Sequence, residues 1–400
     1  MSKCKKSSPL LFAKNPCTTF NLKTAMLSIW EKNNFIQYDH IIIGGGIVGL
    51  STAFFIQQKY PSHRVLVLER GLLPSGASTK NAGFACMGSP TELLEDLAIM
   101  PEEKVLALFL LRKKGLERLR ALLGHNAMGY ATNGSYEILE NHQKLTQQDI
   151  DRLNQLLLSE LGMTAFRDAS DKINEFGFEA SFIGGIIENC CEGEIDTGLT
   201  LQCLIRKVQQ SGVEIKTGCE VTQFFEHPTQ VEIICRQPHS QECISFYGAT
   251  LSVCTNAFTS SLIPDLDIQP GRGQVLLTKP IPGLKFKGIF HMEQGYYYFR
   301  EYKGCVLLGG GRNLDFATEQ TTSFDLNAEI QSALEHKLRT LILPHQPVDV
   351  DLRWTGIMAF GKTKEPILSQ YSSRISLGVR MGGMGVAMGS EIGFQLSTWV

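Results

Sequence analysis

The sequence predicts an α/β fold in which two domains are interleaved along the chain. A strand–helix–strand pattern with nearly continuous apolar strands occupies residues 38–69. Shorter alternating runs with turn residues between them fill residues 244–309, and a strand–glycine–helix pattern returns near residue 374. Because the first and last segments are of one type and the middle is of another, we predict discontinuous domains rather than two successive ones.

Composition limits the classes of function. The chain has 400 residues, 43% of them hydrophobic, which is enough for two sizeable cores. Lys and Arg number 38 and Asp and Glu 40, so no broad field favours nucleic acid or an anionic membrane surface, and a small-molecule ligand is expected. The sequence contains no run of 18 consecutive apolar residues, so no membrane-spanning helix is predicted. The segment Met1–Lys6 is not followed by an apolar run, so no export signal is predicted either.

Cysteine usage indicates the compartment. The count of 11 is odd, and the spacing resembles neither a disulfide framework nor a metal site. A reducing, cytoplasmic setting without a bound metal is therefore predicted.

The expected helices and strands follow one another along the whole chain. Residues 1–36 are predicted as an N-terminal extension whose apolar patch, residues 26–30, packs on the domain behind it. A strand at 39–43, a helix at 47–58 and a strand at 64–69 follow, and such continuously apolar strands are typical of a parallel sheet covered on both faces. Further helices are expected at 92–123, 147–161, 200–210, 326–343 and from about 390, and further strands at 213–215, 244–254, 274–278, 296–300, 305–309 and 374–378.

A glycine-rich turn lies between the first strand and the first helix. Gly44 permits the tight turn, Gly46 allows the backbone to approach a pyrophosphate at the helix N-terminus, and Gly49 permits close helix–strand packing. Glu69 ends the second strand, where a carboxylate can accept hydrogen bonds from an adenosine ribose. These features predict a dinucleotide, and they fit NAD and FAD equally well.

Later segments of the sequence distinguish FAD from NAD. Residues 75–84, Ser-Gly-Ala-Ser-Thr-Lys-Asn-Ala-Gly-Phe, form a turn rich in hydroxyls and backbone donors, and five further motifs lie at 270–274, 298–300, 309–312, 354–358 and 382–385. With this turn and this order of motifs the chain resembles the D-amino-acid-oxidase-like (DAO) family of FAD-dependent oxidoreductases. Within the family it is more similar to the amine and glutamyl-amine type than to true amino-acid oxidases.

The resemblance implies a fold and a division of the chain. A glutathione-reductase-like, Rossmann-like FAD-binding domain would comprise 37–125, 186–262 and 350–400, and an α+β substrate domain with a mainly antiparallel sheet over the flavin would comprise 126–185 and 263–349. FAD is expected to be noncovalent, because Ser78–Phe84 contains no His or Cys and Met358 stands near the position of a linking cysteine in sarcosine oxidases; Cys86 is the one nearby exception. The predicted cofactor-binding residues are Gly44, Gly46, Ile47, Val48, Gly49, Glu69, Arg70, Ser78, Thr79, Lys80, Asn81, Ala82, Gly83, Val221, Gly356, Gly382, Gly383, Met384, Gly385 and Val386.

The reaction predicted from the resemblance is oxidation of a C–N bond in a small amine or amino acid, with hydride transfer to flavin N5. The backbone amides of 382–386 would stabilise the reduced ring, and oxygen or another acceptor would reoxidise it. Strand alternation places Tyr296, Tyr298 and Arg300 on one face; the two tyrosines are predicted substrate contacts, and Arg300 is expected to be structural. Two alternatives stay open, which are a structural or sensory flavoprotein subunit and a hydroxy-acid dehydrogenase.

One departure from the family concerns the substrate. Amino-acid oxidases of this family usually place an arginine near Met358 to bind the substrate carboxylate, and methionine cannot do so. This favours an amine or a larger amino compound, unless Arg272, Arg312 or Arg380 replaces the missing cation. Met358 is itself a predicted active-site residue, whereas His291 is not, because a lone histidine is more often a surface or hydrogen-bonded residue.

Overall fold

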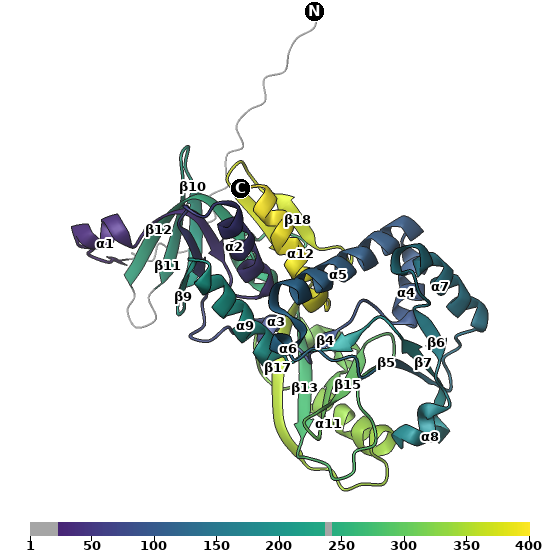
Figure 1. Ribbon diagram of the computed structural model, residues 1–400. Coiled ribbons are helices and arrows are strands. Elements are labelled where there is room, and N and C mark those ends of the chain that lie inside the picture. Colours follow the sequence, from purple (N-terminus) through teal and green to yellow (C-terminus); the bar gives the residue numbers. More distant parts are fainter. Residues whose placement is uncertain (1–22, 237–241) are drawn as a thin grey trace, which may run out of the picture.

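Two β-sheets organise the chain, as seen in a computed structural model that describes residues 23–236 and 242–400 (Figure 1). The first sheet has nine strands, and the second has eight. The path of the first is β10 (Glu220–Glu226), β11 (Val231–Arg236), β12 (Glu242–Val253), β2 (Gln37–Ile43), β3 (Val65–Leu68) and β9 (Glu214–Lys216), with β1 (Lys23–Thr24), β18 (Ile367–Gln370) and β19 (Ile375–Val379) attached through β12 and β19. The predicted α/β class is confirmed.

The predicted strand–helix–strand unit forms the centre of the first sheet. β2 pairs in parallel with both β12 and β3, and α2 (Ile47–Lys59) connects β2 to β3. Residues Ile41–Ile43 and all four residues of β3 are buried, which explains why their sequences lack polar alternation. The first sheet therefore presents the C-terminal ends of its parallel strands at one edge, together with the start of α2.

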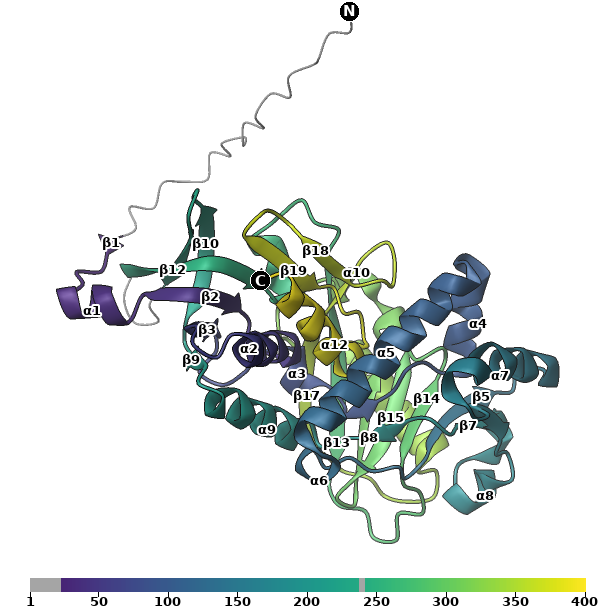
Figure 2. The ribbon, with the colours of Figure 1, turned by 45° about the horizontal axis from the view of Figure 1, so that its top comes forward.

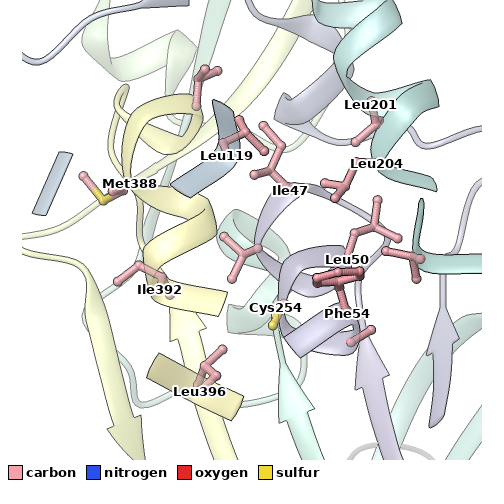
Figure 3. Close-up of a cluster of buried hydrophobic side chains, with 14 of the residues drawn as sticks. Ile47, Leu50, Phe54, Leu119, Leu201, Leu204, Cys254, Met388, Ile392 and Leu396 are labelled. Carbon is pink, nitrogen blue, oxygen red and sulfur yellow. The ribbon is translucent and has the colours of Figure 1, made fainter. Parts of the chain in front are cut away.

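The core of this domain lies between α2 and three other helices. Figure 3 shows side chains of α2 between those of α9 (Thr197–Gln210) and α12 (Gly385–Thr398), with Leu119 of α5 (Glu102–Leu123) beside them. Glycines permit the close approach: a Cβ on Gly393 would lie 2.6 Å from the Ser51 Cβ, and one on Gly115 would lie 2.2 Å from the Ala387 carbonyl oxygen. α12 is thereby fixed against both α2 and α5.

The second sheet runs β17 (Val350–Phe360), β13 (Gln269–Thr278), β16 (Cys305–Gly310), β15 (Tyr297–Tyr302), β14 (Ile289–Met292), β5 (Ser135–Glu140), β7 (Ile183–Asn189) and β6 (Phe166–Asp168). All its pairings are antiparallel except the one between β14 and β5. One face packs aromatic and aliphatic residues, among them Phe290 and Phe299, against α11 (Ala328–Lys337). The opposite face is turned toward the first domain.

The remaining elements are short connections and covering helices (Figure 2). They are α1 (Ile29–Asn34), α3 (Ala77–Lys80), β4 (Phe84–Ala85), α4 (Pro90–Ile99), α6 (His125–Met128), α7 (Gln147–Leu161), α8 (Lys172–Phe176), β8 (Gly193–Glu194) and α10 (Phe316–Glu319), with 3-10 turns at Ala180–Phe182, Asn256–Ser261 and Arg312–Leu314. Among the described residues, no helix is both long and apolar enough to cross a bilayer, and no group of three or more His, Cys, Asp or Glu side chains is arranged to hold a metal.

Some expectations about helices, sheets and packing differ from the structure. The helix expected over 92–123 is two helices, because Pro101 interrupts it, and the helix expected over 326–343 continues beyond α11 as a π-helix at Leu338–Ile342. β17 lies in the second sheet, although its residues fall in a segment predicted for the first domain; the domain division itself stays a prediction. Finally, the apolar patch at 26–30 does not pack as expected: Met26, Ile29 and Trp30 are 98%, 60% and 72% exposed, and only Leu27 contacts the core.

A buried histidine in the first sheet makes stability depend on pH. Burial, followed by the charge of His63, lowers the pKa of His40 to about 4. The unfolded chain binds this proton below about pH 6.5, whereas the folded chain does not, so stability is lost as the pH falls from 6.5 to 4. We expect the free energy of unfolding to drop by about 2 kcal/mol between pH 7 and pH 5, measured by urea titration. His40→Asn should reduce this dependence, and a replacement at the exposed His142 should leave it unchanged.

Candidate functional site

A cavity of about 1090 Å³ lies between the two sheets and is lined by residues of both. It extends from the turn after β2, past the loop before β4, to the face of the second sheet that carries Tyr298 and Met358. Ordinary small-molecule pockets have volumes of about 300–1000 Å³, so this cavity suits a large ligand such as a dinucleotide together with a small substrate.

The glycine turn has the close contacts that its sequence predicts. Gly44 has φ +111°, and a Cβ there would lie 2.6 Å from the Cys254 carbonyl oxygen. A Cβ on Gly49 would lie 2.0 Å from the Gly44 carbonyl oxygen, so this residue permits α2 to contact the turn. By contrast, a Cβ on Gly46 would meet only the Ser78 side chain, with 2.8 Å between the Cβ and Oγ. Gly46 therefore lines the cavity with Ser78 packed directly against it, and it leaves no room for a side chain.

Glu69 lies at the end of β3, directly beside the turn. Its Oε2 accepts the Gly45 N–H at 2.9 Å, and its Oε1 accepts the Gly71 N–H at 2.9 Å and the Ser75 hydroxyl at 3.3 Å. A carboxylate has about four acceptor positions, so Glu69 retains capacity toward the cavity that it lines. The Arg70 guanidinium lies 3.5 Å from the centre of the Phe258 ring and also lines the cavity.

The loop that contains α3 covers the start of α2. The Ser78 hydroxyl accepts the Ile47 N–H at 3.0 Å, which fixes the loop on the helix N-terminus. Asn81 binds its own loop: its Nδ2 donates to the Ala77 and Ser78 carbonyls, and its Oδ1 accepts from Gly83 N and the Thr197 hydroxyl. Its side chain therefore positions the loop rather than presenting free polar atoms.

The loop before α12 closes another side of the cavity. Gly382 has φ +56°, and its N–H donates to the Ala359 carbonyl oxygen at 2.9 Å. A Cβ on Gly382 or Gly383 would meet nothing within 4 Å, so both peptide units are open toward the space between the domains. α12 begins at Gly385, five residues earlier than the sequence predicts, and its first-turn amides also line the cavity.

The second sheet contributes the wall opposite the loops. Strand register places His291 opposite Tyr298 and Tyr298 opposite Gly309, so these positions share one face. Tyr298 packs edge-on against Phe84, with 5.6 Å between ring centres, and burial raises its pKa to about 12. Met358 lies farther along this face, where its Cε is 3.0 Å from the position of a Cβ on Gly273. Tyr296 lies just before β15 and packs edge-on against Phe316.

The three arginines considered as replacements for a carboxylate-binding arginine differ in their partners. Arg272 is buried and forms a two-point ion pair with Glu319, with N–O distances of 2.7 and 2.9 Å. Arg380 pairs with Asp267 at 2.6 Å. Arg312 lines the cavity between the rings of Phe316 and Phe360, 4.7 and 4.0 Å from their centres, and has no carboxylate partner within 23–236 and 242–400. Burial lowers its pKa, so an anion beside it would be favoured.

The sequence expectations for two further side chains near the cavity, Arg300 and His291, can be compared with the structure. Arg300 donates to the carbonyl oxygens of Gly83 and Ile195 and pairs with Glu194 at 3.3 Å, which confirms its structural role. His291 is neither a surface residue nor a hydrogen-bonded one: it is 5% exposed, it lines the cavity, and its buried Nε2 has no hydrogen-bond partner within the described residues. The sequence expectation that His291 is a surface or hydrogen-bonded residue was therefore wrong, and the pairing of β14 with β5 that places it here is a long-range feature that no local pattern reveals.

All the predicted site residues line this cavity except Gly49, Thr79 and Gly83. Gly49 acts through helix packing, the Thr79 hydroxyl donates to the carbonyls of Pro74 and Gly76, and the Gly83 carbonyl accepts from Arg300. These three residues therefore shape the loops instead of facing the cavity. Val221, Gly356 and Lys80 are brought to it from β10, β17 and α3.

Two curated enzymes are similar to this chain in sequence. The chain is 23% identical over 340 residues to L-2-hydroxyglutarate dehydrogenase of Escherichia coli strain K12, which covers 76% of this chain and 73% of that protein. Glycine oxidase of Geobacillus kaustophilus is 34% identical over 65 residues, or 16% of each chain.

Solved structures share the fold. L-proline dehydrogenase from P. horikoshii superposes with a TM-score of 0.70 at 14% identity over 90% of this chain and 92% of that one. Glycine oxidase from Geobacillus kaustophilus gives 0.66 at 18% identity over 90% and 93%. The sequence model of the DAO family, described as FAD dependent oxidoreductase, matches residues 39–399. The chain therefore belongs to the DAO family of FAD-dependent oxidoreductases.

Proposed function

We propose that this protein binds FAD noncovalently in the cavity and oxidises the C–N bond of a small amine or amino acid that carries a carboxylate. The dinucleotide part would lie along the glycine turn, with its pyrophosphate at the N-terminus of α2 and its ribose at Glu69. The flavin ring would lie between the loop 80–84 and the second sheet, with the amides of 382–386 at one end. The position of Gly46 on the cavity wall and the open backbone at Gly382–Gly383 support this placement.

The single observation that carries the substrate proposal is Arg312. Arg312 is half-buried, and a partly desolvated guanidinium without a carboxylate partner favours a ligand that supplies the anion. Arg312 lines the cavity near Tyr296, which contributes to its electrostatic surroundings, and its NH1 is 3.1 Å from the position of a Cβ on Gly271. Gly271 pairs with Met358 in the sheet, so the cation stands near the methionine that occupies the usual arginine position. We infer that the carboxylate-binding function has moved from that position to Arg312.

The proposed roles of the other residues follow from their positions. Bound FAD would supply a two-electron acceptor for the hydride of the substrate carbon. Tyr296 and Tyr298 would cover the substrate and exclude water, and Met358 would provide an apolar contact for its side chain. Arg312 would fix the carboxylate and so orient the adjacent C–H bond. Oxygen or another small acceptor would then restore the oxidised cofactor.

A second candidate is oxidation of a 2-hydroxy acid. The similarity over 340 residues to L-2-hydroxyglutarate dehydrogenase favours it, and Arg312 would bind the carboxylate of such a substrate equally well. The two candidates differ only in the atom, nitrogen or oxygen, that becomes doubly bonded to carbon.

Anaerobic reduction of the purified protein distinguishes these candidates. The protein is incubated with matched sets of amino acids, N-methyl amino acids, amines without a carboxylate, and 2-hydroxy acids, and the absorbance of the bound flavin near 450 nm is followed. We expect bleaching by a carboxylate-bearing amino compound and none by the corresponding amine. Bleaching by hydroxy acids alone would replace the first candidate with the second, and an unchanged spectrum with every compound would favour a structural or sensory flavin.

A further inference from the structure

His291 occupies a position that the reaction proposed above does not use. The residue lies on β14 opposite Tyr298, and its ring packs edge-on against Phe84, with 5.1 Å between ring centres. It is 5% exposed, and what remains exposed faces the cavity. Its Nε2 is fully buried and has no hydrogen-bond partner within the described residues. Because Nε2 lies on the side of Glu192, the other ring nitrogen, Nδ1, is the one that a ligand in the cavity would contact.

Glu192 lies behind the imidazole. Its Oε2 is 3.9 Å from His291 Nε2, close enough to stabilise a cationic ring but longer than a hydrogen bond. The amides of Met87 and Gly88 and the Ser135 hydroxyl donate to this carboxyl group, and they fix its orientation. Burial raises the pKa of Glu192, and His291 opposes that rise. The two side chains therefore form a buried acid–base pair with one member on the cavity wall.

Other ionisable groups around His291 are already engaged or more distant. Glu137 on the neighbouring strand β5 accepts hydrogen bonds from Ser89 and Thr91, and burial raises its pKa. On β15, Tyr298 is neutral at physiological pH because burial raises its pKa to about 12. Cys86, after β4, is buried with a raised pKa, while Arg112 donates to the Met87 carbonyl oxygen and Glu92 caps α4. Glu192 is thus the carboxylate that faces His291 most directly.

We propose that His291 is the proton acceptor of the oxidation, with Glu192 as the residue that positions and stabilises it. The substrate carbon would lose its hydrogen together with the C–H electron pair, as a hydride, to bound FAD. The adjacent N–H or O–H bond would break, its proton would go to the His291 ring, and its electron pair would form the C=N or C=O double bond. In total the substrate would lose two electrons and one proton as the hydride and a second proton to His291. This inference rests on the proposed function, because it requires a substrate with N–H or O–H beside the reacting carbon.

Two measurements test the proposal. The first follows the His291 resonance against pH and requires no turnover, and the second follows the rate of flavin reduction against pH and requires a substrate. In the oxidised holoprotein labelled with ¹³C at histidine Cε1, the His291 resonance is identified by its absence from His291→Gln. We expect it to titrate, and we expect Glu192→Gln to lower its midpoint, because the carboxylate that stabilises the imidazolium is removed. A resonance that does not move between pH 5 and pH 9, or a midpoint unaffected by Glu192→Gln, would overturn the proposal.

Rapid anaerobic mixing with the substrate from the panel above then measures the rate of flavin reduction. In the wild type this rate should rise with pH through one ionisation; in His291→Gln it should fall by about 100-fold or more and lose that ionisation. His142→Gln, at an exposed histidine, serves as the matched control, and His291→Asn replaces the glutamine variant if that variant loses FAD. An unchanged rate and profile in a flavin-replete His291 variant would refute the role of His291 alone. If no compound reduces the flavin, the proposed function fails, while the titration of His291 still stands.

Discussion

Replacement of Gly46 by valine is expected to abolish retention of FAD. A Cβ at this position would lie 2.8 Å from the Ser78 Oγ, which already accepts the Ile47 N–H, and the branched side chain would fill the space proposed for the pyrophosphate. The backbone cannot move away, because Gly44 and Gly49 hold the turn against Cys254 and α2. Overpacking of this kind costs about 1–3 kcal/mol before the lost phosphate contacts are counted, or about 5- to 150-fold in affinity.

The measurement is the ratio of flavin to protein absorbance after purification and dialysis. Gly198→Val serves as the control, since Gly198 lies in α9, does not line the cavity, and would place its Cβ 3.3 Å from only one side-chain atom. Circular dichroism should show the same secondary structure in both variants. A Gly46→Val protein with its full complement of flavin would refute the assignment of the turn to the cofactor.

Replacement of Arg312 by methionine should lower kcat/KM for a carboxylate-bearing substrate by about 30-fold or more, since loss of one partner of a charge pair that substrate binding buries costs about 2–5 kcal/mol. The rings of Phe316 and Phe360 would still pack on the methionine, so the shape of the cavity is preserved. Arg312→Lys should recover part of the activity, because it restores the charge without the two-point geometry.

Steady-state kinetics of the three proteins test this result, with Arg152→Met as a control at an exposed arginine. The decisive comparison is between substrates. The loss of kcat/KM should occur only with compounds that carry a carboxylate, and it should be absent for any amine without a carboxylate that the enzyme turns over. Equal losses for both kinds of compound would mean that Arg312 supports the cavity wall instead of binding the substrate.

Local sequence signals predicted the parts of the fold that depend on neighbouring residues. The helix expected at 147–161 has these bounds in the structure, because Thr146 caps it and Gly162 ends it in the left-handed conformation. The turn at 44–49 was likewise predictable, since its glycines act within one strand–helix connection. The early start of α12 was missed because the glycines of 382–385 indicate a loop and conceal the first helical turn.

Features that depend on distant pairing were not predictable from these signals. The parallel contact between β14 and β5 joins residues about 150 positions apart, and it brings His291 beside the group that includes Glu192. The choice among Arg272, Arg312 and Arg380 also depended on partners, Glu319 and Asp267, that periodicity cannot assign. A sequence shows which cations are present; only the fold shows which of them are already neutralised.

The order of strands in the first sheet has a consequence for synthesis of the protein. β2 and β3 are made early, but β12 at 242–253 completes the flank of β2, and α12 at 385–398 packs against α2. At about 5–20 residues per second, translation leaves this early unit with exposed apolar faces for many seconds before its partners emerge. The turn at 44–49 thus leaves the ribosome well before β12 and α12, and it is enclosed only when these later elements have been made.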